Sequence, residues 1–135
     1  MHDYPKALEY YNKALGICKK IYGEEHSDIA MSYDYIGLVY YNLSDYFESL
    51  EYYNKALVIR KKLYGEDDSR TAASYVNIGL IYRKTGNYPE ALAYFNKAWI
   101  IYERVYKEKN YFTKELEEII ESLSKEHHSD TKAGE

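Results

Sequence analysis

Apolar residues recur along most of this chain at steps of three and four, the spacing of amphipathic α-helices. The first such segment has apolar or aromatic residues at Tyr4, Ala7, Leu8, Tyr11, Ala14, Leu15, Cys18, Ile21 and Tyr22. The pattern predicts long helices over 4–22, 46–64 and 88–106 and shorter helices over 28–42 and 70–84. No segment alternates with a period of two, so strands are not expected. The predicted class is all-α.

Local signals place the helix ends. Pro5 suits a first helical turn, Gly23 suits a C-terminal cap, and Ser27 is the expected N-cap of the second helix. Every connection is short, so consecutive helices should run antiparallel.

The chain repeats itself every 42 residues: Tyr4–Asp45 is followed without a gap by Tyr46–Asn87, and a third copy opens at Tyr88. Such repeats stack, each burying the apolar face of its neighbour. A stack presents a surface, whereas an active site needs unlike residues converging on one point. The repeat therefore predicts a binding platform.

Two glycines lie inside the shorter helices, Gly37 and Gly79, each within Tyr-x-x-Ile-Gly-Leu-x-x-Tyr. A glycine in a helix interior costs about 1 kcal/mol against alanine. We expect the compensation to be close approach of a partner helix, with the small residues Ala14, Ala56 and Ala98 on the long helices.

This arrangement resembles the tetratricopeptide repeat. The matching residues are Tyr33, Ile36, Gly37 and Tyr40 in one copy and Tyr75, Ile78, Gly79, Tyr82, Gly86, Tyr88, Ala91, Phe95 and Ala98 in the next. The 42-residue period exceeds the family's common length of about 34 residues and resembles the kinesin-light-chain subclass. The resemblance implies a right-handed α-solenoid of antiparallel helix pairs that acts as a non-catalytic scaffold for protein interactions.

We expect a single domain over 1–128, made of a half repeat (4–22), repeats 28–64 and 70–106, and a capping helix over 111–127. The capping helix keeps one apolar stripe and carries Glu117 and Glu121 where the repeats have Tyr and Gly. Residues 129–135 are expected to be a disordered tail.

The first long helix is expected to leave the face around Ala7, Tyr11 and Ala14 uncovered. An open face of this kind favours either removal from a longer array or association with another copy.

In the family, the first helix of each repeat lines a concave groove. The corresponding residues here are Met31, Asp34, Tyr35, Leu38, Tyr41, Asn42, Ala73, Val76, Asn77, Leu80, Arg83 and Lys84. The two copies differ at these positions, which indicates either a repeat-specific function or drift of exposed residues. A peptide could bind here over an apolar floor, with Asn77 pairing with its backbone and Arg83 and Lys84 meeting acidic groups.

Composition excludes several other functions. The net charge is −4 with dispersed acidic residues, so nucleic-acid binding is not expected. There is no apolar run near 18 residues, so a membrane span is not expected. The single cysteine, Cys18, fits a reducing compartment, which favours the cytoplasm.

No motif for a metal, a cofactor or catalysis is found, because the four histidines (His2, His26, His127 and His128) lack ligand spacing. The sequence thus predicts a non-enzyme that binds an unidentified protein or peptide. A self-assembling repeat fragment and a regulatory domain of a larger protein remain as alternatives.

Overall fold

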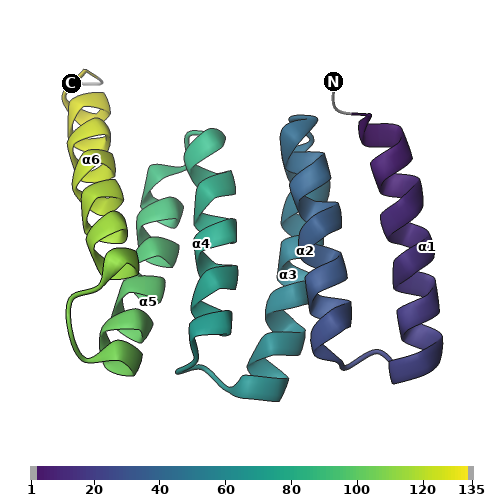
Figure 1. Ribbon diagram of the computed structural model, residues 1–135. Coiled ribbons are helices and arrows are strands. Elements are labelled where there is room, and N and C mark those ends of the chain that lie inside the picture. The colour runs from purple at the N-terminus through teal and green to yellow at the C-terminus, as the bar shows by residue number, and fades with distance from the viewer. Residues whose placement is uncertain (1–2, 134–135) are drawn as a thin grey trace. The chain divides into compact units, whose positions relative to one another are not determined.

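The computed structural model describes the backbone of residues 3–133 and the side chains of residues 3–126 (Figure 1). The described residues form α-helices and no strand. The helices are α1 (Tyr4–Tyr22), α2 (Ser27–Asn42), α3 (Tyr46–Tyr64), α4 (Ser69–Lys84), α5 (Tyr88–Tyr106) and α6 (Tyr111–Ala133). The predicted all-α class and the long and short helices are confirmed.

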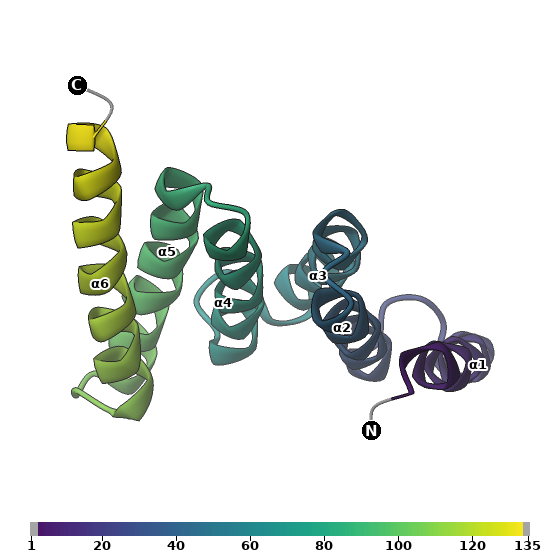
Figure 2. The same cartoon turned by 90° about the horizontal axis from the view of Figure 1, so that it is seen from above.

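The helices divide into two compact units, residues 1–65 and 66–135, called unit 1 and unit 2 below. Unit 1 contains α1, α2 and α3, and unit 2 contains α4, α5 and α6. Figure 2 shows the three helices of unit 2 following one another as neighbours. The expectation of one domain over 1–128 remains a prediction.

The glycine prediction is confirmed by the packing of each helix pair. A Cβ on Gly37 would lie 3.0 Å from the ring of Tyr53 on α3, and a Cβ on Gly79 would lie 2.9 Å from the ring of Phe95 on α5. An aromatic ring, rather than an alanine, thus occupies the space above each glycine. The Ser49 hydroxyl on α3 also donates a 2.7 Å hydrogen bond to the Gly37 carbonyl.

Two helix ends differ from the sequence-based expectation. Helix α2 already begins at Ser27, and its N-cap is His26, whose Nδ1 accepts a hydrogen bond from the Asp28 amide at 3.1 Å. Helix α6 continues to Ala133, so the residues 129–133 that we expected in a disordered tail are helical. Residues 134 and 135 of that expected tail lie outside the described residues.

Candidate functional site

The predicted groove residues of the second repeat line a cleft within unit 2. The cleft has a volume of about 370 Å³ and lies between α4 and α6, above α5. Helix α4 contributes Ala73, Val76, Asn77, Leu80 and Arg83, which are five of the six groove residues predicted on it. The sixth, Lys84, is exposed and does not line the cleft.

The wall opposite α4 comes from α6, which sequence reasoning did not include in the groove. Phe112, Glu115, Leu116 and Ile119 of α6 line the cleft together with Tyr102 of α5. At a spacing of 42 residues, Glu115 corresponds to Ala73 and Ile119 to Asn77. Extending the repeat register into the degenerate last helix would therefore have identified these residues.

Helix α6 is held against α5 by a buried seam. Leu116 and Leu123 are buried, and the Phe112 ring stacks on the Tyr102 ring with centroids 5.2 Å apart. The indole N–H of Trp99 donates to Glu117 at 3.2 Å. Glu117 thus accepts a bond from α5 at the position where the repeats carry tyrosine. These contacts fix the wall of the cleft without a ligand.

The cleft is mainly apolar with polar groups at separate points. Val76, Leu80 and Ile119 supply aliphatic surface, while Asn77, Arg83 and Glu115 supply an amide, a cation and a carboxylate. Such a surface suits an extended segment that inserts apolar side chains and pairs its backbone with an amide. Burial raises the pKa of the Tyr102 hydroxyl to about 12, so this residue is neutral at physiological pH.

The predicted groove residues of the first repeat are only partly brought together. Tyr35, Leu38 and Asn42 of α2 line a cavity of about 200 Å³ with Ala7 and Tyr11 of α1. Met31, Asp34 and Tyr41 do not line it. The Tyr11 ring stacks on Tyr35 with centroids 5.3 Å apart, so Tyr11 packs towards α2 and is half-buried. Ala14, the third residue of the predicted self-association face, is also half-buried.

Asp34 is neutralised within unit 1. Its Oδ2 lies 2.5 Å from Nη1 of Arg60 on α3, and both side chains are largely buried. Burial raises the pKa of Asp34, and Arg60 opposes that rise. The ion pair means that the charge of Asp34 is compensated within unit 1.

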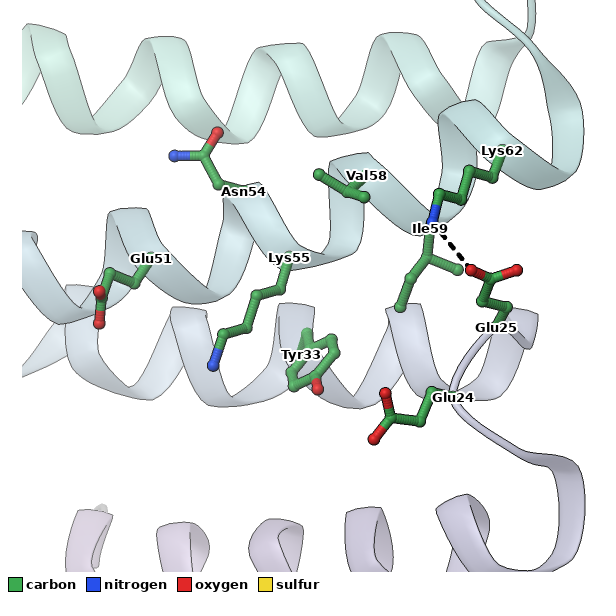
Figure 3. Close-up of a pocket in the computed structure, with 9 residues that line it drawn as sticks. All are labelled: Glu24, Glu25, Tyr33, Glu51, Asn54, Lys55, Val58, Ile59 and Lys62. Carbon is green, nitrogen blue, oxygen red and sulfur yellow. Dashed lines mark hydrogen bonds and ion pairs between the residues drawn. The ribbon is translucent and has the colours of Figure 1, made fainter.

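A cavity of about 550 Å³ lies on the α2–α3 pair of unit 1 (Figure 3). Glu51, Lys55 and Lys62 of α3 line it together with Glu24 and Glu25, which precede α2, and Lys62 pairs with Glu25 at 2.8 Å. Lys55 lies over the rings of Tyr33 and Tyr52, at 5.5 and 4.9 Å from their centroids. Charges of both signs thus line this cavity, and they do not form a site for an anion or a cation alone.

Among the described residues, no group of histidine, cysteine, aspartate and glutamate side chains is arranged to hold a metal ion. None of the helices within the described part of the chain has the length and apolar character needed to cross a membrane.

Comparison with known proteins identifies the class. The tetratricopeptide repeat family matches residues 1–43 and 28–104. The chain therefore belongs to the tetratricopeptide repeat family, with repeats of 42 residues. No curated protein matches the sequence.

The chain is also similar to a solved structure, that of BtubC (BKLC) from P. vanneervenii. The TM-score is 0.82 at 22% sequence identity, over 97% of this chain and 52% of that one. The likeness confirms the predicted fold of antiparallel helix pairs. The chain spans about half the length of that structure.

Proposed function

We propose that this chain is a non-catalytic interaction scaffold that binds an extended segment of a partner protein in the cleft of unit 2. The observation that carries the proposal is the cleft itself. The α4 residues that line this mainly apolar cleft differ from their counterparts in the first repeat. Family membership supports the general role, since tetratricopeptide repeats mediate protein interactions. We place this role in the cytoplasm, on the basis of the single cysteine.

The chemistry of the cleft defines the segment. Leu80 and Ile119 would receive an aliphatic side chain, and the Asn77 amide would pair with a backbone group beside it. Arg83 would favour a carboxylate on the ligand, whereas Glu115 would oppose one near it. The expected ligand therefore carries an apolar anchor with an acidic residue on its Arg83 side.

The test is selection of peptides from a displayed library of random heptapeptides on the immobilised chain. Selected peptides should lose binding to a variant that combines Asn77→Ala and Leu80→Ala. Lys84→Ala is the matched control, because Lys84 is on the same helix but outside the cleft. Equal binding to the wild type and to the combined variant would refute the groove assignment.

A further inference from the structure

Two side chains of opposite charge lie at opposite ends of the cleft in unit 2. Helices α4 and α6 run in the same direction (Figure 1). Glu115 lies four residues after the start of α6, as Ala73 lies four residues after the start of α4, whereas Arg83 is in the last turn of α4. At 1.5 Å per residue, the step from Ala73 to Arg83 corresponds to about 15 Å. The carboxylate and the guanidinium are therefore separated by about this length along the cleft.

The protein leaves both charges available to a ligand. Among residues 3–126, whose side chains the structure describes, no ion pair involves Arg83 or Glu115. In unit 1, by contrast, the carboxylate of Asp34 is compensated by Arg60. A ligand with a charge at each end can pair with Arg83 and Glu115 without displacing a partner that the protein supplies.

The Glu115 end of the cleft also carries aromatic rings. Phe112, one turn before Glu115 on α6, stacks on Tyr102 and has its ring centroid 6.2 Å from that of Tyr106. Phe112 is 47% exposed and Tyr106 43% exposed. A carboxylate beside an exposed aromatic ring favours a cation, through charge pairing and attraction to the ring. This end of the cleft therefore suits a lysine or arginine side chain.

The apolar part of the cleft lies between the two charges. Ile119 is one turn beyond Glu115 on α6, about 6 Å further along the cleft. Leu80 is three residues before Arg83 on α4, about 4.5 Å short of it. The side chains of Ile119 and Leu80 are half-buried and line the cleft. The order along the cleft is thus carboxylate, aliphatic surface, guanidinium.

The spacing of these groups matches alternate residues of an extended peptide. Such a peptide rises about 3.3 Å per residue, and every second side chain points to the same side. Three alternate residues therefore face the cleft together and span about 13 Å, close to the separation of Glu115 and Arg83. The middle residue falls about 6.6 Å from the Glu115 end, which is level with Ile119. Asn77, the counterpart of Ile119 at the 42-residue spacing, can pair with the peptide backbone there.

We propose that the cleft of unit 2 recognises a five-residue segment with a basic, an apolar and an acidic residue at alternate positions. The basic residue pairs with Glu115 beside the Phe112 ring. The apolar residue enters between Leu80 and Ile119, and the acidic residue pairs with Arg83. This inference rests on the proposed function, because it assigns a sequence pattern to the segment that the cleft binds.

The probes are two dye-labelled peptides with blocked ends, which carry the pattern in the two possible chain directions. One contains Lys-Ser-Leu-Ser-Glu and the other Glu-Ser-Leu-Ser-Lys, because side chains alone make the three proposed contacts. We expect saturable binding of at least one peptide by fluorescence anisotropy, weakened by added salt. Replacing its lysine by glutamate, or its glutamate by lysine, should weaken binding at least about threefold, since an attraction becomes a repulsion.

Charge reversal on the protein identifies the partner of each peptide charge. Glu115→Lys should weaken binding of the mixed-charge peptide and strengthen binding of the peptide with two glutamates. Arg83→Glu should have the same effect for the peptide with two lysines. Glu118→Lys and Lys84→Glu are the matched controls, because both residues are exposed and lie outside the cleft. They change the net charge equally and should leave the preference for the mixed-charge peptide unchanged.

The outcomes separate this inference from the proposed function. Library-selected peptides may require Asn77 and Leu80 while neither probe binds, or while all charge variants of a probe bind equally. Either result would refute the charge pattern and leave the cleft as the binding site. Tighter binding of the peptide with two glutamates to the wild type would also refute it, because the ligand is then acidic throughout. Equal binding of the probes to the wild type and to the variant combining Asn77→Ala and Leu80→Ala would overturn both.

Discussion

The Asp34 carboxylate and the Arg60 guanidinium form a largely buried ion pair, 2.5 Å apart, between α2 and α3. At the corresponding positions of unit 2 the chain has Val76 and Tyr102. The two repeats thus fill the same place with different chemistry. In unit 1 a neutralised pair stands where unit 2 has the apolar base of its cleft, so the cleft of unit 2 is the more hydrophobic surface.

Transferring the unit 2 pair into unit 1 should stabilise the fold. A buried ion pair exchanged for apolar residues of similar volume is often neutral or stabilising by about 1–4 kcal/mol, whereas removal of one partner costs about 3–5 kcal/mol. We expect Asp34→Val combined with Arg60→Tyr to match or exceed the wild type in urea unfolding, and Arg60→Tyr alone to lose stability. An additive double-mutant cycle would contradict this coupling.

The same pair predicts a pH effect. Burial raises the folded-state pKa of Asp34. Protonation of Asp34 therefore contributes stability to the fold, which is fully present below the unfolded-state pKa and is lost as pH rises through the folded-state pKa. The stability gained by the double variant over the wild type should therefore increase with pH from the acid side towards neutrality. Urea midpoints measured from pH 3.5 to 7 test this, and a constant difference would argue against it.

Gly79 and Gly16 should respond in opposite directions to alanine. A Cβ at Gly79 would lie 2.9 Å from the buried ring of Phe95. Such overpacking costs about 1–3 kcal/mol, which exceeds the stability that alanine gains over glycine in a helix. A Cβ at Gly16 meets no atom within 4 Å, so Gly16→Ala should gain about 0.5–1 kcal/mol. Chemical denaturation of both variants measures the signs, and a stabilised Gly79→Ala would show that the close contact is not restrictive. Gly79→Leu should lose more than Gly79→Ala.

The N-cap of α5 can be improved from within the chain. Asp3 and Asp45 cap α1 and α3 with side-chain hydrogen bonds, whereas Asn87 at the same position makes no such bond to α5. Asn87→Asp restores the repeat's own cap and adds a negative charge at a helix N-terminus, which should stabilise by about 0.3–1 kcal/mol. Thermal unfolding at low salt measures this gain. High salt should reduce it, and a lower Tm than that of the wild type would contradict the prediction.

Alkaline pH should weaken unit 2 through Tyr102. Burial raises its pKa to about 12, so its stabilising contribution is complete below the unfolded-state value near 10 and is lost as pH rises through about 12. Tyr102→Phe should therefore lose less stability than the wild type between pH 10 and 12. The measurement is unfolding followed by fluorescence of Trp99, the single tryptophan, and parallel losses in both proteins would count against this cause.

The sequence predicted the helices, the glycine packing and the α4 side of the cleft because these features recur at a fixed spacing. It missed the α6 side because Glu115 and Ile119 lie where the repeat has degenerated. The Asp34–Arg60 pair was missed for a related reason. Both residues are absent from the second repeat, and only their joint replacement by Val76 and Tyr102 would have indicated contact.

The most direct test of the central claim is to map a library-selected peptide onto the ¹⁵N-labelled chain by NMR titration. The account predicts that amide resonances of Asn77, Leu80 and Ile119, which line the cleft of unit 2, shift with a common saturation curve. Lys84, outside the cleft, should change little. Shifts confined to Glu51, Asn54 and Val58, in the cavity of the α2–α3 pair, would contradict the assignment of the cleft as the binding site.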